Sequence, residues 1–130
     1  MSLPNLSEKT VLVIDDNSDC VETYKLILEF EGFKVLTALG GEEALTILSQ
    51  VSDPDLILLD LRMEGMSGLE FLTALEERSP ETVKNVPVVF LSGMNEIPPS
   101  KAVGFIQKPI TLDKFISSVT HFITKVAPVS

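Results

Sequence analysis

Leu56-Ile57-Leu58-Leu59-Asp60 is a run of four branched aliphatic residues that ends in a carboxylate. An unbroken apolar run of this length is typical of a strand buried on both faces, as strands of a parallel sheet are. The alternative, that Asp60 is a plain surface turn residue, fits poorly with its place at the end of the most apolar strand. We therefore treat Asp60 as a candidate functional residue and work outward from this strand.

Four further short runs of strand-forming residues alternate with segments of helical periodicity. We predict strands at residues 11–14, 33–38, 56–59, 86–91 and 103–106. Helices are expected after the first, second and third strands and at the C-terminal end of the chain. Strand–helix alternation of this kind predicts an α/β domain with a parallel sheet covered by helices on both faces.

Residues with known capping preferences mark the expected helix boundaries. Gly32 is suited to end the first helix, and Thr111 is suited to begin the last one. Ser67 and Glu70 have the spacing of a capping box, which predicts the start of the third helix. Pro80 lies beyond the expected end of that helix. We predict four helices in all.

Four of the five predicted strands end in polar side chains that can take part in chemistry. Asp15 and Asp16 follow the first strand, Asp60 the third, Ser92 the fourth and Lys108 the fifth. In an open parallel sheet, ligands bind outside the carboxyl ends of the strands. Residues spread along most of the sequence are therefore expected to meet in one small site.

The predicted site combines three carboxylates with one cation, a set that suits a metal and a phosphoryl group. Mg²⁺ prefers oxygen ligands and is typically held by one or two carboxylates together with a phosphate. Asp15 and Asp16 are candidate ligands, directly or through water, and Asp60 is both a ligand and a nucleophile that can form an acyl phosphate. Lys108 and Ser92 can stabilise the charge that develops on the phosphoryl group.

Five motifs in this order resemble the receiver domain of two-component response regulators. No single motif is diagnostic, but each lies at or near the end of a predicted strand, and the resemblance covers roughly residues 11–125. The motifs are Val13-Ile14-Asp15-Asp16-Asn17, Leu58-Leu59-Asp60-Leu61-Arg62-Met63, Met66-Ser67-Gly68, Phe90-Leu91-Ser92 and Lys108-Pro109.

The resemblance implies a fold, a donor and a set of roles. The fold would be a flavodoxin-like, doubly wound five-stranded sheet of order 2-1-3-4-5. Asp60 would receive its phosphoryl group from a phosphohistidine on a histidine kinase or histidine phosphotransfer protein, with Mg²⁺ as cofactor. The backbone carbonyl of Arg62 would be a further metal ligand. Ser92 and Phe105 would form the switch that relays the change to an unknown output partner or attached domain.

The sequence departs from the family pattern at three places. Glu64 replaces a proline that is usual four residues after the acceptor, and Phe105 stands where a tyrosine is common. Only residues 93–102 separate the fourth and fifth predicted strands, and Gly93, Pro98 and Pro99 among them oppose a regular helix. We therefore expect the family's helix at this crossover, its fourth, to be truncated or replaced by a loop. A dimer that needs that helix should be absent.

Composition sets the limits of this interpretation. The length of 130 residues fits one domain, which we place at residues 10–126, with a disordered or tag-like segment at 1–9 and a tail or linker stub at 127–130. A net charge of −9 argues against direct nucleic-acid binding, and no apolar run is long enough for membrane insertion. A single cysteine, Cys20, suits a reducing, cytoplasmic location.

Several residues also have plainer interpretations. Asp15 and Asp16 could simply cap the first helix, although Asn17 or Ser18 can do so. Lys108 could be a solvated lysine, Ser92 a loop residue and Phe105 an ordinary core residue. The most plausible roles of four others are structural: Asp53 and Asp55 as turn residues, Cys20 as a core or boundary residue, and His121 as a surface residue.

Two other functions compete with a phosphorylated receiver. A phosphatase of the haloacid-dehalogenase type also uses an aspartate and Mg²⁺, but it resembles Asp-x-Asp-x-Thr after the first strand. The residues two positions past Asp15 and Asp16 are Asn17 and Ser18, so that motif is missing. A degenerate receiver that binds partners without phosphorylation is the other alternative, and the presence of all five site residues argues against it.

Overall fold

The computed structural model describes residues 9–93 and 98–125, which form a five-stranded parallel sheet of order β2-β1-β3-β4-β5. The predicted fold class and strand order are therefore confirmed. Strand boundaries shift by one or two residues from the predicted ones. The strands are β1 (Thr10–Ile14), β2 (Lys34–Ala38), β3 (Leu56–Asp60), β4 (Val88–Ser92) and β5 (Gly104–Gln107).

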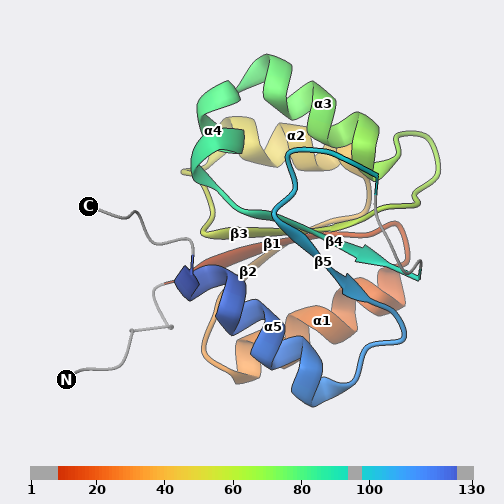
Figure 1. Cartoon of the computed structure of the whole chain (residues 1–130), viewed down its shortest axis with the longest axis vertical. Coiled ribbons are helices and arrows are strands. Elements are labelled where there is room, and N and C mark those ends of the chain that lie inside the picture. The colour runs from red at the N-terminus through yellow and green to blue at the C-terminus, as the bar shows by residue number, and fades with distance from the viewer. Residues whose placement is uncertain (1–8, 94–97, 126–130) are drawn as a thin grey trace.

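Helices cover both faces of this sheet (Figure 1). Helices α1 and α5 lie on one face, and α2, α3 and α4 lie on the other. None of the helices within the described ranges is long and apolar enough to cross a membrane. The helices are α1 (Ser18–Phe30), α2 (Gly41–Gln50), α3 (Gly68–Arg78), α4 (Pro80–Asn85) and α5 (Leu112–Lys125).

Strand β3 is the centre of the core, and all five of its residues are buried, including Asp60. Side chains of a strand alternate between the two faces of the sheet, so β3 contributes to two apolar layers. Ile57 and Leu59 pack in the layer under α2 and α3, whereas Leu56 and Leu58 pack in the layer under α1 and α5. Each buried aliphatic side chain stabilises the fold by roughly 1.5–3 kcal/mol.

The predicted helix boundaries at Ser67 and Gly32 are confirmed, and Asn17, one of the two alternatives to an aspartate, caps α1. The amide of Asn17 caps α1, because its Oδ1 accepts a hydrogen bond from the N–H of Cys20 at 3.1 Å. Ser67 and Glu70 form both hydrogen bonds of the capping box at the start of α3. Gly32 follows α1 with φ of 101°, a left-handed conformation that favours glycine.

One short helix, α4, was not predicted from the sequence. Pro80 does lie beyond the end of α3, as expected, but it also occupies the first turn of α4, where its fixed φ suits a helix and its missing N–H costs little. The buried Thr82 of α4 donates a hydrogen bond to Oδ1 of Asp53 at 3.0 Å. Six residues are too few to show a helical period, so this helix depends on tertiary contacts.

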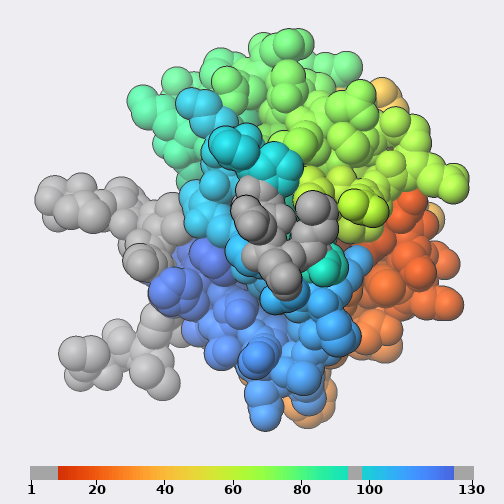
Figure 2. All heavy atoms as spheres, turned by 45° about the vertical axis from the view of Figure 1, so that its right-hand side comes forward, coloured from red at the N-terminus to blue at the C-terminus, as the bar shows by residue number. Residues whose placement is uncertain are grey.

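The crossover between β4 and β5 contains no helix in its described residues, 93 and 98–103. Residues 94–97 of the predicted crossover loop lie outside the described ranges. The described part of the crossover therefore supports the expected loss of a full helix at this place. Figure 2 shows the cyan crossover residues between green α3 and the blue residues of β5 and α5. Pro99, Ser100 and Lys101 line a small pocket together with residues of α3.

The predicted N-terminal and C-terminal segments lie mostly outside the described part of the chain. Residues 1–8 of the first and all of 127–130 are not described. Lys9 is described, and its carbonyl accepts a hydrogen bond from the N–H of Lys34 at 2.9 Å. The hydrogen bonding between the β1 and β2 segments therefore begins at Lys9, one residue before β1.

Gly68 allows the first turn of α3 to pack directly on the end of β3. A Cβ at this position would lie 2.6 Å from the carbonyl oxygen of Asp60, 3.0 Å from Cα of Leu61 and 3.0 Å from Cε1 of Phe90. Two of these atoms are backbone, so they cannot move aside cheaply. Glycine is thus required at position 68, because α3 approaches the backbone of Asp60 closely there.

We predict that Gly68→Ala destabilises the protein by about 1–3 kcal/mol, the usual cost of overpacking. Helix propensity alone would give the opposite sign, because alanine is favoured over glycine in helices. The free energy of unfolding in urea measures the difference. Gly93→Ala is the matched control, since a Cβ there meets nothing within 4 Å. A Gly68→Ala variant as stable as wild type would contradict the close approach.

Candidate functional site

The register of the sheet brings the polar ends of four strands to one edge. Ile14 of β1 pairs with Leu59 of β3. The residues that follow them, Asp15 and Asp60, therefore lie next to each other at the ends of these strands. Asp60 in turn pairs with Leu91, which places Ser92 one residue further along β4. Ser92 pairs with Gln107, the residue before Lys108. Strand pairing alone therefore gathers residues that are far apart in sequence.

Asp60 is a buried carboxylate with specific polar partners, and its residue is only 7% exposed. Its Oδ1 accepts a hydrogen bond from the backbone N–H of Arg62 at 3.3 Å and lies 3.6 Å from the ammonium nitrogen of Lys108. Because a buried carboxylate needs such partners to remain in place, Lys108 and the N–H of Arg62 fix the orientation of this side chain.

Asp15 is more deeply buried still, at 1% exposure. Its Oδ1 accepts a hydrogen bond from the N–H of Asn17 at 3.0 Å, and its Oδ2 lies 3.5 Å from Nζ of Lys108. Lys108 thus makes ion pairs with two buried aspartates at once. Since Asn17 is the residue that caps α1, the interpretation of Asp15 as a mere helix cap is not supported.

Asp16 is the exposed member of the acidic cluster. Its Oδ2 accepts a hydrogen bond from the backbone N–H of Glu64 at 2.9 Å. One carboxylate oxygen each of Asp15, Asp16 and Asp60 lies within 4.8 Å of the others. The three carboxylates that the sequence predicted to meet are therefore brought together.

Burial and repulsion raise the pKa of Asp60 from 3.8 to about 6. The largest cause is desolvation, which disfavours the charged form, and the negative charge of Asp15 is the second. Lys108 and the N–H of Arg62 lower the pKa but do not cancel the first two effects. Lys108 therefore compensates only part of the cost of burying the charged carboxylate of Asp60.

The donor set fits a hard divalent cation. All three converging side chains offer carboxylate oxygens, the ligand type that Mg²⁺ prefers, and the excess negative charge favours a cation. Asp15 uses one oxygen in a hydrogen bond and the other in an ion pair. Asp16 is exposed, and one of its oxygens accepts the hydrogen bond from Glu64. Neither sulfur nor imidazole ligands occur in the cluster, which disfavours a structural zinc site.

Ser92, Phe105 and Arg62 lie at the end of β4, in β5 and two residues after Asp60, respectively. Ser92 is buried at the end of β4, and its carbonyl accepts a hydrogen bond from the N–H of Lys108 at 2.7 Å. Phe105 is half-buried and packs in the layer under α2 and α3. Arg62 follows Asp60 by two residues and is exposed. Phe105 therefore has the surroundings of a packing residue.

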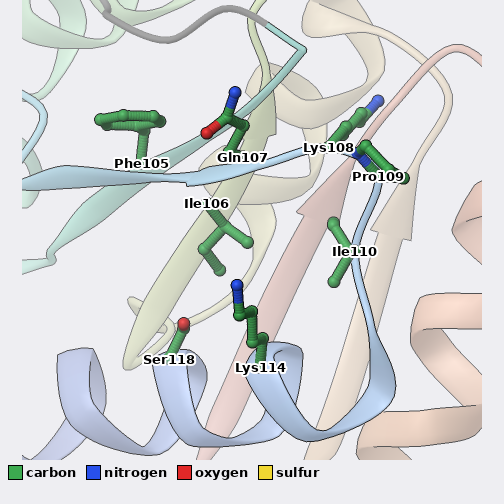
Figure 3. Close-up of a pocket in the computed structure, with 8 residues that line it drawn as sticks. All are labelled: Phe105, Ile106, Gln107, Lys108, Pro109, Ile110, Lys114 and Ser118. Carbon is green, nitrogen blue, oxygen red and sulfur yellow. The ribbon is translucent and has the colours of Figure 1, made fainter.

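A pocket of about 360 Å³ lies between β5 and α5 and is bordered by Lys108 (Figure 3). Ile106 points toward Lys114 and Ser118 of α5, whereas Phe105 and Gln107 point to the opposite side of β5 (Figure 3). The ammonium of Lys108 pairs with the aspartates, so this pocket is next to the site but is not its centre.

The remaining candidates of the sequence have structural surroundings. The N–H of Thr10 donates a hydrogen bond to Oδ2 of Asp55 at 2.8 Å, and Asp53 accepts one from Thr82. His121 is exposed and makes an edge contact with the ring of Phe122, and Cys20 is partly buried with no disulfide.

Sequence reasoning missed the backbone N–H groups that hold the carboxylates. Asn17, Arg62 and Glu64 each donate a backbone hydrogen bond to an aspartate of the site. Every residue except proline has a backbone N–H, so the presence of this donor cannot be recognised from the residue type. Glu64 is the exception among the three, because it stands where a proline is usual.

The fold and site define a class of protein, and the family comparison agrees with it. The family model of the response regulator receiver domain matches residues 11–120, so the chain belongs to this family. It is a receiver domain of two-component signal transduction.

Individual relatives show how far the similarity extends. The cell cycle transcriptional regulator CtrA of Caulobacter vibrioides is 36% identical over 115 residues, which are 84% of this chain and 48% of that protein. The chain thus spans about half the length of this relative. The polar-differentiation response regulator DivK of Brucella ovis is 26% identical and is covered over 96% of its length by 88% of this chain.

Solved structures support the same fold. The signal receiver domain of a signal transduction histidine kinase from Syntrophus aciditrophicus superimposes with a TM-score of 0.79 at 27% identity. The match covers 94% of this chain and 95% of that one.

We predict that Asp60→Asn stabilises the metal-free protein in a pH-dependent manner. Because the folded-state pKa of Asp60 is raised, the native state holds its proton more tightly than the unfolded state between pH 4 and 6. Stability from this group is therefore present below pH 4 and is lost as the pH rises to about 6. The gain from Asp60→Asn should grow from near zero to on the order of 2–3 kcal/mol at pH 7.

Urea unfolding in the presence of a chelator, repeated between pH 4 and 7, measures this gain. Asp113→Asn, at an exposed position in α5, controls for the loss of one negative charge. A gain that does not change with pH would show that the pKa of Asp60 is not raised.

Proposed function

We propose that Asp60 accepts a phosphoryl group from a phosphohistidine donor in a Mg²⁺-dependent reaction. The observation that carries this proposal is the position of Lys108, whose ammonium lies 3.5 Å from Asp15 and 3.6 Å from Asp60. A cation held between a nucleophilic carboxylate and a metal-type carboxylate is suited to a phosphoryl group that brings further negative charge.

In the proposed transfer, an oxygen of the Asp60 carboxylate attacks the phosphorus. The new O–P bond forms as the N–P bond of the donor breaks, and the donor imidazole keeps the electron pair and takes up a proton. Lys108 stabilises charge on the phosphoryl oxygens, and the hydroxyl of Ser92 donates a hydrogen bond to one of them. Hydrolysis of the acyl phosphate later returns free Asp60 and inorganic phosphate.

The metal ligands in this proposal are Asp15, Asp16, Asp60 and the backbone carbonyl of Arg62. A bound Mg²⁺ would supply positive charge that offsets the repulsion between three carboxylates and an incoming phosphoryl group. Asp15 and Asp16 hold the cation directly or through water, while the N–H groups of Asn17 and Arg62 keep two of the carboxylates oriented.

A phosphatase and a degenerate receiver are the two alternatives. The first lacks its motif, since Asn17 and Ser18 stand where a second aspartate is needed. The second conflicts with a complete set of site residues. A phosphatase would release phosphate from many donors without retaining it, a degenerate receiver would take up none, and the proposed receiver would retain one phosphoryl group.

The proposed partners follow from this chemistry. They are a histidine kinase or a histidine phosphotransfer protein as donor, and an output partner or an attached domain as receiver of the signal. We propose a cytoplasmic location, and a receiver domain that extends over residues 10–126. Direct binding to nucleic acid is not part of the proposal, because the net charge is −9.

We predict that Asp60→Ala abolishes labelling by a small phosphodonor. With acetyl phosphate and Mg²⁺, the wild-type protein should gain the mass of one phosphoryl group, and the variant should gain none. Asp113→Ala, an exposed aspartate far along the chain in α5, should be labelled like the wild type. A chelator should prevent labelling of the wild type. Full labelling of the Asp60→Ala variant would refute the assignment of the acceptor.

We further propose that output does not use a face that depends on a helix between β4 and β5. The described crossover residues 93 and 98–103 are not helical, and Pro98 and Pro99 lack backbone donors. Phosphorylation is proposed to act through Ser92 on the crossover and on the packing of Phe105. The signal would then pass through the loop itself, or the domain would act as a phosphoryl relay or sink.

We predict that a phosphate mimic leaves the receiver monomeric. Sedimentation velocity with and without beryllium fluoride and Mg²⁺ should show the same species, because the expected pairing surface lacks its helix. Loss of labelling by acetyl phosphate on the same sample shows that the mimic has bound at Asp60. A tight, mimic-dependent dimer that Lys114→Glu on α5 disrupts would contradict the prediction.

A further inference from the structure

The hydrogen bond between Glu64 and Asp16 joins two loops of the site that are 48 residues apart in sequence. The N–H of Glu64, in the loop between β3 and α3, donates to Oδ2 of Asp16, in the loop between β1 and α1, at 2.9 Å. Both residues are exposed, so neither is held in place by packing. Among the described residues, this hydrogen bond therefore connects the exposed carboxylate of Asp16 to the loop that follows Asp60.

The side chain of an exposed aspartate normally rotates freely. The side chain of Asp16 is instead held by a hydrogen bond, and its fixed orientation would affect how it binds a cation. A hydrogen bond from a backbone N–H to a charged carboxylate is short and stronger than a neutral one. With Oδ2 of Asp16 fixed on Glu64, the other oxygen has a defined direction relative to Asp15 and Asp60. Groups that orient metal ligands in this way commonly change metal affinity by about ten- to a hundred-fold.

The contribution comes from the backbone of Glu64 and not from its side chain. Any residue with an N–H can donate this hydrogen bond, but proline cannot. The sequence has Glu64 where a proline is expected from the family resemblance, so the donor exists here because the proline is absent. The exposed carboxylate of Glu64 only adds negative charge to the rim of the site.

We propose that the backbone N–H of Glu64 is a positioning group for Asp16 and thereby sets the Mg²⁺ affinity of the site. This inference rests on the proposed metal binding and adds a residue to it. Glu64 does not contact the phosphoryl group and is not a catalytic residue. Its effect passes entirely through the orientation of Asp16.

Two substitutions at the same position separate the backbone from the side chain. Glu64→Pro removes the N–H, and Glu64→Ala keeps the N–H but removes the carboxylate. Among the described residues, only glycines have positive φ, so the sign of φ at Glu64 is compatible with proline. Calorimetric titration with MgCl₂ should show an affinity about ten- to a hundred-fold weaker for Glu64→Pro. Glu64→Ala should stay within about threefold of the wild type, since loss of an exposed charge is largely screened.

A metal-free measurement tests the contact itself. In an NMR spectrum of the protein with a chelator, Asp16→Ala should shift the amide proton of Glu64 upfield, because its hydrogen bond to a carboxylate is lost. Asp19→Ala, an exposed aspartate in the first turn of α1, is the matched control and should leave that amide unchanged. This readout does not depend on whether Glu64→Pro folds.

The outcomes distinguish this inference from the proposed function. Wild-type protein that binds no Mg²⁺ would defeat the metal half of the proposed function and, with it, the effect of Glu64 on affinity. Wild-type binding with equal affinity in Glu64→Pro would overturn the inference alone, as would an equal loss in Glu64→Ala. An unshifted Glu64 amide in Asp16→Ala would also overturn it, whatever the titrations give.

Discussion

The ammonium of Lys108, placed between two buried aspartates, is the interaction on which the site depends. Asp15 and Asp60 are 1% and 7% exposed, and two uncompensated negative charges at such depth would strongly oppose folding. Lys108 lies close to both and offsets part of this cost. The compensation is incomplete, because the pKa of Asp60 remains raised to about 6. The remaining excess of negative charge is the physical basis of the proposed Mg²⁺ site.

The rest of the fold serves to hold these charges at one edge of the sheet. The apolar strands β1, β3 and β4 pair in register, so residues that follow them must lie together whatever the loops do. Gly68 lets α3 approach the backbone of Asp60, and the N–H groups of Asn17, Arg62 and Glu64 orient the carboxylates. Stability of the core is thus used to keep a destabilising cluster in place, which is a common feature of functional sites.

The site at the strand ends does not depend on a helix in the described part of the crossover between β4 and β5. The site residues at the ends of the strands are complete, although the described part of the crossover lacks a helix. Strand pairing positions Ser92 and Lys108 without that helix, since each lies at the end of its own strand. A surface built from the helix has no such support. Loss of the helix therefore alters the proposed output without affecting the geometry of the site.

The sequence by itself determined the parallel α/β class, the main helices and the meeting of Asp15, Asp16, Asp60, Ser92 and Lys108 at one edge, whereas the strand order was implied only by the family resemblance. These features follow from local apolar patterns and from the general rule for parallel sheets. Only the tertiary structure decided the helix α4, the raised pKa of Asp60 and the hydrogen bond from Glu64 to Asp16. Each of these depends on burial or on contacts between distant segments. Local periodicity carries no information about such contacts, and a backbone N–H is invisible in a sequence.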